Sequence, residues 1–314
     1  MKKVLAVVGP TASGKTSLSI KVAGKINGEI ISADSRQVYK NIPIATAQPT
    51  EDDLKIVKHY FINELELSDE FSAGQFGIKG REIISDIFSR GKLPVITGGS
   101  GLYIRSIIDG LFENDSKSDE IREKLYSEYE KHGEEYLYNE LYNVDPVTFE
   151  KIPKGKHRRV IRALEVYYTT GKKISELQNE LPEIDFKTVQ IGLNHDRKIL
   201  YERINNRVDA MLSNGLTDEV KKLLESGYHF KNNYSVDTVG IKEVIKFLEG
   251  EYDLEYMKEM IKQNSRRYAK RQMTWFRKDK RIHWINMEEH SEEEVVNLVL
   301  EIFKSEKFIP LFNN

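Results

Sequence analysis

A glycine-rich segment near the start of the chain constrains its fold more than any other feature. Residues 9–16 read GPTASGKT and match the phosphate-binding pattern G-x-x-x-x-G-K-[ST]. The apolar run Val4–Val8 precedes this segment, and a helical pattern at 15–25 follows it. A buried strand, a glycine-rich loop and a helix in this order form the context in which such a loop holds a phosphate group. The sequence therefore predicts a sheet with an anion site at the end of its first strand.

The residues of this segment have separate roles. The glycines let backbone N–H groups turn inward to form an anion cradle, and the helix N-terminus adds a partial positive charge. Lys15 supplies a full charge, and the Thr16 hydroxyl is placed to bind Mg²⁺. The predicted phosphate-binding residues are Gly9, Pro10, Thr11, Ala12, Ser13, Gly14, Lys15 and Thr16. The pattern indicates a di- or triphosphate group and leaves open both the molecule that carries it and the bond that breaks.

Strand and helix patterns alternate after this loop. Apolar, β-branched runs predict strands at 29–33, 60–62, 94–97 and 189–193. Helices are expected at 73–90, 200–212 and 253–277. This alternation predicts an α/β fold, a P-loop NTPase-like core in which a parallel sheet is flanked by helices.

The texture of the sequence changes around residue 112, after the strand predicted at 94–97. From residue 113 to 143 acidic residues dominate, and apolar residues recur at i+4. This spacing is typical of helices. We therefore expect a core domain formed by 1–112 and 183–314, and an α-helical insertion domain at 113–182.

Composition excludes several classes of site. The chain has no cysteine, so disulfides, thiolate nucleophiles and cysteine-based metal centres are ruled out. The formal net charge is −2, so any surface for a nucleic acid must be local. No apolar stretch approaches the ~20 residues that span a bilayer. We expect a cytoplasmic protein without membrane contact.

Polar residues follow two of the predicted strands. Asp34 comes directly after the second strand, and at the carboxyl end of a parallel strand it should lie beside the phosphate loop. Its carboxylate could be a metal ligand, a general base or a helix cap. The segment GGSGLY at 98–103 follows the fourth strand, and its glycines suit either a close approach to a ligand or a tight turn.

Local positive charge gathers in three places. Residues 154–162 carry five lysine and arginine side chains in nine, in addition to His157, and 266–277 combine many basic residues with aromatic ones. The second stretch, which includes Arg267, Lys270 and Arg271, is predicted to bind a phosphate backbone, with its aromatic residues in the core. On the 200–212 helix, Arg203 and Arg207 lie i+4 apart and could close over a phosphate; the alternative is a pair of surface arginines.

Taken in order, these segments resemble the tRNA dimethylallyltransferase family almost from end to end. The motifs that carry the resemblance are GPTASGKT at 9–16, ADSRQVY at 33–39, GGSGLYI at 98–104, HRRVIRALEV at 157–166, TGKKISEL at 170–177 and RRYAKRQMTWFR at 266–277. The first is shared with many nucleotide-binding proteins. The other five in this order are specific.

The resemblance implies a reaction and its partners. These enzymes transfer a dimethylallyl group from dimethylallyl diphosphate to N6 of the adenosine on the 3′ side of the tRNA anticodon. The loop would hold the pyrophosphate with Mg²⁺, and the helical insertion would grip the anticodon stem-loop. We expect no membrane contact and a monomer.

The resemblance also assigns residues. The catalytic set is Lys15, Thr16 and Asp34, with Asp34 as general base, Thr16 as metal ligand, and Arg203 or Arg207 assisting at the pyrophosphate. Ser35 and Gln37 would hold the flipped adenine. The predicted tRNA-binding residues are Asp34, Ser35, Arg36, Gln37, Gly101, Arg122, Arg158, Arg159, Val160, Ile161, Arg162, Arg267, Lys270 and Arg271.

Two positions depart from the family pattern, and rival functions remain. Gln48 stands where the family usually has a lysine that contacts phosphate, and Ile241 stands where it usually has a stacking tyrosine.

The nearest rival is an adenylate isopentenyltransferase acting on free AMP or ATP, which needs neither the insertion nor the basic helix. A P-loop small-molecule kinase is a rival of another class, and a catalytically silent RNA-binding protein is the third.

Overall fold

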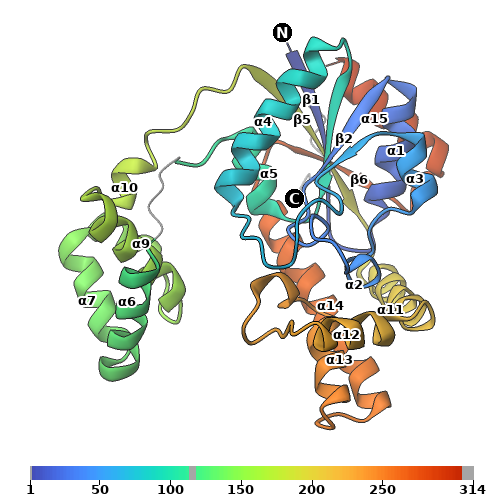
Figure 1. The fold of residues 1–314 in the computed structure, drawn as a ribbon. Coiled ribbons are helices and arrows are strands. Elements are labelled where there is room, and N and C mark those ends of the chain that lie inside the picture. Colours follow the sequence, from blue (N-terminus) through green and yellow to red (C-terminus); the bar gives the residue numbers. More distant parts are fainter. Residues whose placement is uncertain (1, 113–117, 306–314) are drawn as a thin grey trace. The chain divides into compact units, whose positions relative to one another are not determined.

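The computed structural model describes residues 2–112 and 118–305 (Figure 1). It contains two compact units: the first combines the described parts of 1–108 and 185–314, and the second is Asp109–Ile184. The strands, all in the first unit, are β1 (Lys2–Val8), β2 (Gly28–Ser32), β3 (His59–Tyr60), β4 (Leu93–Gly98), β5 (Phe186–Asn194) and β6 (Ile282–Asn286). Its helices are α1 (Lys15–Lys25), α2 (Pro43–Thr46), α3 (Glu51–Ile56), α4 (Ala73–Ser89), α5 (Gly101–Ile108), α11 (Arg197–Ser213), α12 (Leu216–Glu225), the short η1 (Tyr234–Val236), α13 (Ile241–Leu248), α14 (Leu254–Phe276) and α15 (Glu292–Ser305).

The six strands form one parallel sheet in the order β3-β2-β4-β1-β5-β6. Val4–Val8 of the central strand β1 are completely buried, as a strand covered on both faces must be. The predicted α/β fold with a parallel sheet is confirmed. The edge strand β6 was not predicted, because its polar and apolar residues read equally well as part of a loop.

The third predicted strand is shorter than expected. We predicted 60–62, but β3 ends at Tyr60. Phe61 has φ +62°, a left-handed conformation that no strand accommodates, and it places the Phe61 ring 4.7 Å from that of Phe76. The apolar character of this segment therefore reflects packing under the sheet edge rather than pairing within it.

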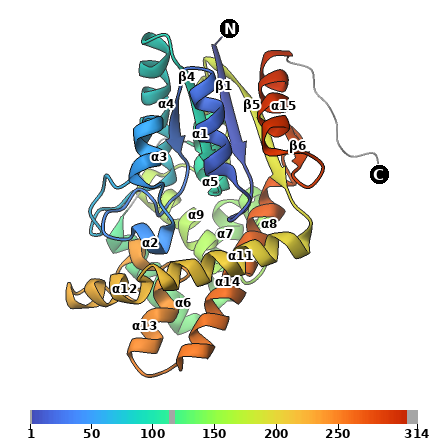
Figure 2. The ribbon, with the colours of Figure 1, turned by 90° about the vertical axis from the view of Figure 1, so that its right-hand side faces the viewer.

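Helices cover both faces of the sheet. α1 and α15 pack together on one face, where Leu18, Val22 and Val299 join a core cluster with Val7 and Ile191 of the strands. α4 and α5 pack on the other face (Figures 1 and 2). Both β1 and α1 are thus packed into the core, and this packing fixes the two ends of the glycine-rich loop between them.

The helices α11, α12, α13 and α14 form a layer at the carboxyl ends of the strands (Figure 2). α11 packs against α14, and α12 and α13 extend the layer. Leu200 and Ile204 of α11 and Ala269 of α14 form a small apolar cluster that also touches Ala12 of the glycine-rich segment. The fold therefore brings the basic C-terminal stretch, far away in sequence, next to the phosphate loop. In the described ranges, every helix is too short or too polar to cross a bilayer.

The described part of the second unit contains five helices: α6 (Asp119–His132), α7 (Glu134–Val144), α8 (Pro146–Lys151), α9 (His157–Thr170) and α10 (Ile174–Leu177). Leu125, Leu137, Leu141 and Leu164 fill its core. Its bounds, Asp109–Ile184, are a few residues wider at each end than the predicted insertion of 113–182.

Candidate active site

The glycine-rich segment at residues 9–16, called the phosphate loop after its predicted role, connects the end of β1 to the start of α1. Gly14 has φ +87° and precedes the first helical residue, a conformation that a side chain would strain, and Ala12 is also left-handed at +63°. The Lys15 ammonium folds back over the loop and donates to the Pro10 carbonyl at 2.5 Å. The loop conformation is therefore supported by its own backbone angles and by the Lys15 side chain.

Two arginines of α11 lie beside this loop. Arg203 Nε donates to the Ala12 carbonyl at 2.8 Å. Arg203 and Arg207 line a cavity of about 450 Å³ together with residues 12–17. The arginines that sequence spacing left open as a phosphate clamp or a surface pair thus lie at the phosphate loop.

Positive charge is concentrated at this end of the site. Burial is the main cause that lowers the pKa of Lys15 to about 7, the nearby Arg207 lowers it further, and Asp34 opposes the change. Burial also lowers the pKa of Arg207, again against the effect of Asp34. Because burial disfavours the charged forms of both groups, an anionic ligand beside them would stabilise their positive charge.

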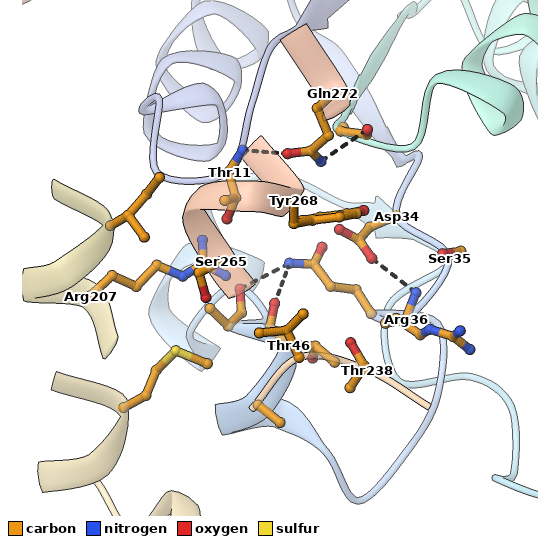
Figure 3. Close-up of a pocket in the computed structure, with 18 of the residues that line it drawn as sticks. Thr11, Asp34, Ser35, Arg36, Thr46, Arg207, Thr238, Ser265, Tyr268 and Gln272 are labelled. Carbon is orange, nitrogen blue, oxygen red and sulfur yellow. Dashed lines mark hydrogen bonds between the residues drawn. The ribbon is translucent and has the colours of Figure 1, made fainter. Parts of the chain in front are cut away.

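A second cavity of about 370 Å³ continues from the loop to Asp34. It is lined by Lys15 and Thr16 of the loop and by Asp34, Ser35 and Gln37. Figure 3 shows Thr11 of the loop and Arg207 on one side of this cavity, and Asp34 and Ser35 on the other. Asp34 Oδ1 accepts a hydrogen bond from the Arg36 N–H at 2.9 Å. Within the described residues this is the one hydrogen bond of the carboxylate, so Oδ2 is available to a substrate. The carboxylate is held by its own turn and faces the cavity.

A network of amides holds Gln37. Its Nε2 donates to the carbonyls of Thr46 and Ala47 at 3.2 and 2.9 Å, and its Oε1 accepts from the Ser32 hydroxyl at 3.0 Å. Gln48 Nε2 donates at 2.9 Å to the carbonyls of Gln37 and Tyr39, so at this family-divergent position the side chain braces the loop. One lone pair of Gln37 Oε1 remains for a substrate donor.

Two residues of α14 that sequence analysis did not assign complete the cavity. Tyr268 points toward Asp34 (Figure 3), and burial, followed by Asp34, raises its pKa to about 12. Gln272 is buried; its Oε1 accepts from the Thr11 N–H at 2.9 Å and its Nε2 donates to the Gly99 carbonyl at 3.0 Å. Their i+4 spacing marks one helix face, but the surrounding basic residues obscured that signal.

The exposed face of α14 carries the predicted basic residues. Arg267, Lys270 and Arg271 are exposed, and Arg271 also lines the cavity. Trp275 is 40% exposed, so the expectation that the aromatic residues of this stretch belong to the core is wrong for it. Its indole lies on Gly101, where a Cβ would come within 2.2 Å of the ring.

The remaining predicted residues of the core unit have other partners. The Ser35 N–H donates to the Ser100 hydroxyl at 3.1 Å. The Arg36 guanidinium binds the carbonyls of Tyr234 and Asp237. Ile241, at the other family-divergent position, is fully buried at the start of α13 and is not available for stacking.

The second unit corrects part of the predicted tRNA surface. Arg158 and Arg159 are exposed on α9, as a phosphate-binding role requires. Val160 and Ile161 are 0% and 2% exposed, so their side chains form core rather than RNA contacts.

Arg122 and Arg162 converge on one buried carboxylate in the same unit. Both pair with Glu165, at 3.0 and 2.9 Å. Burial opposes ionisation of Glu165, but hydrogen bonds from Arg162, the Ser118 N–H and Arg122 together lower its pKa. These two arginines therefore stabilise the unit, whatever else they bind.

Comparison with known proteins gives consistent matches. A family model described as IPP transferase matches residues 37–279. A curated tRNA dimethylallyltransferase from Acetivibrio thermocellus is 47% identical over 301 residues, which cover 94% of this chain and 95% of the relative. The crystal structure of a tRNA isopentenylpyrophosphate transferase from Bacillus halodurans is similar with a TM-score of 0.72 and 36% identity, covering 97% of both chains. A eukaryotic dimethylallyltransferase acting on tRNA has a TM-score of 0.84 and 31% identity, covering 98% of this chain and 81% of the other.

Proposed function

We propose a mechanism for this chain on the premise that it belongs to the IPP transferase family and is a dimethylallyltransferase that acts on tRNA. The resemblance drawn from its motifs is confirmed at the level of the family. The observation that carries the mechanism is one continuous cavity with the phosphate loop at one end and Asp34 and Gln37 at the other. Such a cavity suits a prenyl pyrophosphate and an adenine that meet between its ends.

The pyrophosphate of dimethylallyl diphosphate binds at the phosphate loop. The loop N–H groups, Lys15, Arg203 and Arg207 hold its oxygens and stabilise the charge that grows there as the carbon–oxygen bond breaks. The two cavities that meet at Lys15 and Thr16 support this placement.

Magnesium fits this donor set. Thr16 and Asp34 offer hard oxygen atoms to one cavity, and no group of three metal-binding side chains occurs among the described residues. Thr16 would therefore hold Mg²⁺ together with pyrophosphate oxygens and water, the ligands this ion prefers. The ion would neutralise charge on the departing pyrophosphate.

The adenine binds at the other end. N6 of adenine attacks C1 of the dimethylallyl group, the C1–O bond breaks, and its electron pair leaves with pyrophosphate. The N6 proton goes to Asp34 Oδ2, which makes Asp34 the general base. Gln37 Oε1 accepts the second N6 hydrogen with its remaining lone pair, and Ser35 lies beside the base.

The tRNA contacts the basic face of α14 and, in the second unit, the start of α9. Arg267, Lys270 and Arg271 bind phosphates near the cavity mouth, and Arg158 and Arg159 bind phosphates of the anticodon stem-loop. Because tRNA is the substrate, we place the reaction in the cytoplasm. We also propose that the chain acts as a monomer.

The double variant Arg267→Ala with Arg271→Ala is expected to weaken tRNA binding and to flatten its salt dependence. Each lost phosphate contact lowers the slope of log K against log salt by about 0.7 to 0.9. Filter binding of an anticodon stem-loop at several salt concentrations measures both. Lys221→Ala with Lys222→Ala removes the same charge from the exposed face of α12 and serves as control. An unchanged slope in the first variant would move the docking surface elsewhere.

The function itself is tested by prenyl transfer from labelled dimethylallyl diphosphate with Mg²⁺. An unmodified anticodon stem-loop and AMP are offered in parallel. We expect label in the stem-loop alone. Label in AMP alone would mean that the chain acts on free nucleotides and would overturn the assignment.

A further inference from the structure

An exposed tyrosine stands at the mouth of the cavity. Tyr234 is 68% exposed, and no other large apolar side chain among the described residues is more exposed. It nevertheless lines the cavity that contains Asp34. A large aromatic ring that stays in water at the entrance to a binding cavity forgoes the free energy that burying its apolar surface would provide. Such exposure often marks a surface that binds a ligand.

One face of this ring is already covered. The Arg36 guanidinium lies 4.1 Å from the centroid of the Tyr234 ring. The same guanidinium donates to the carbonyls of Tyr234 at 2.7 Å and Asp237 at 3.2 Å. Arg36 therefore fixes both the ring and the backbone that carries it, and the N–H of Arg36 binds Asp34 directly.

The segment on either side of the ring is anchored as well. Ser235 and Val236 are buried, and the Ser235 hydroxyl donates to the Leu67 carbonyl at 2.6 Å. Lys242 pairs with Asp237 at 2.8 Å. Tyr234 is thus the outward-facing residue of a fixed turn, so little conformational entropy is lost when a ligand packs on it.

We propose that the open face of Tyr234 is a stacking platform for the base of a nucleotide next to the target adenosine. The inference rests on the proposed function, and it adds a binding contact outside the reacting groups. The adenosine that reaches Asp34 lies inside the cavity, so the base that meets a ring at the mouth belongs to a neighbouring nucleotide. A flat aromatic ring backed by a guanidinium suits any base, because every base has a π face.

Four variants and three RNAs test the proposal. Tyr234→Ala removes the platform, Tyr234→Phe keeps it, and Tyr234→Leu keeps apolar area without a ring. Tyr256→Ala removes another exposed tyrosine, 52% exposed and outside both cavities, as control. Each variant is titrated with the stem-loop and with stem-loops that are abasic on the 5′ or the 3′ side of the target adenosine.

We expect Tyr234→Ala to weaken binding of the intact stem-loop roughly fivefold or more, with Tyr234→Phe close to the unsubstituted chain. One of the two abasic RNAs should bind the unsubstituted chain and Tyr234→Ala equally. The turnover number at saturating RNA should stay within about twofold, since stacking on a base outside the cavity acts on binding.

Other outcomes overturn the platform. Equal loss with intact and abasic RNAs, or binding by Tyr234→Ala as tight as that of the unsubstituted chain, would show that no base stacks there. Recovery with Tyr234→Leu would mean that area rather than a ring is required. Absence of prenyl transfer by the unsubstituted chain would instead refute the proposed function, so the two failures are distinguishable.

Discussion

Replacing Asp34 by asparagine is expected to lower the rate of prenyl transfer by about 10² to 10⁴, the usual contribution of a general base. The asparagine keeps the size of the side chain and an oxygen for the Arg36 N–H, which Asp34 now accepts at 2.9 Å. The loop should therefore stay in place while the proton acceptor is lost. The N6 lone pair is delocalised into the adenine ring, so the amine attacks poorly unless its proton is removed.

Single-turnover rates with saturating substrates measure this loss, and stem-loop binding measures the affinity. We expect affinity within about twofold of the unsubstituted chain, because a general base acts mainly in the transition state. Asp34→Ala should lose as much activity, and Asp52→Asn, an exposed carboxylate on α3, should lose none. Activity of Asp34→Asn within tenfold of the unsubstituted chain would disprove the assignment.

Replacing Lys15 by methionine is expected to reduce the rate by about 10² to 10³, as for removal of one preorganised group that stabilises transition-state charge. Methionine has a similar length, so the loop keeps its packing but loses the ammonium. Weaker binding of dimethylallyl diphosphate should accompany the slower rate, because the leaving pyrophosphate is charged before and after the bond breaks. A variant with normal rate and affinity would remove Lys15 from the mechanism.

The pKa of Lys15 adds a pH dependence with a definite sign. In the free protein this pKa is about 7, and a bound pyrophosphate favours the ammonium and raises it. At a pH between the pKa of Lys15 in the free protein and its higher pKa in the complex, binding is accompanied by uptake of a proton by Lys15. The affinity for pyrophosphate therefore falls as the pH rises above 7, by up to about tenfold per pH unit. Calorimetry with inorganic pyrophosphate from pH 7.5 to 9 should show this slope, and Lys15→Met should lack it. An identical slope in both proteins would assign the titration to another group.

Much of the core could be predicted from local patterns. The helix at 15–25 and the buried strand before it follow from apolar periodicity and the glycine-rich loop, which act within a dozen residues. β3 and β6 were misjudged because both lie at edges of the sheet, where pairing with one neighbour decides the strand and periodicity is weak. The positive φ of Phe61 has no signal in its residue type.

For the candidate site too, some features could be predicted from the sequence and others could not. Its chemistry, a lysine and hydroxyl at a phosphate loop and a carboxylate after the next strand, was readable from residue types and their positions along the chain. Which side chains converge was not, because Tyr268, Gln272 and Tyr234 reach the cavity from helices more than 200 residues after the loop. Val160 and Ile161 show the converse: their motif is basic, but helical geometry turns these two side chains into the core.

The sequence by itself determined the α/β class, the glycine-rich loop and the family, because each depends on residue type and short spacing. Only the tertiary structure decided that Arg36 backs an open tyrosine, that Gln272 joins the loops 9–14 and 98–100, and that Gln48 braces Gln37. The Gln272 contacts depend on how α14 packs across the carboxyl ends of the strands, and the Arg36 contact depends on where the chain places Tyr234 of η1. Both are long-range arrangements that no local pattern encodes, and the Gln48 contact depends on the fold of the loop that carries both glutamines.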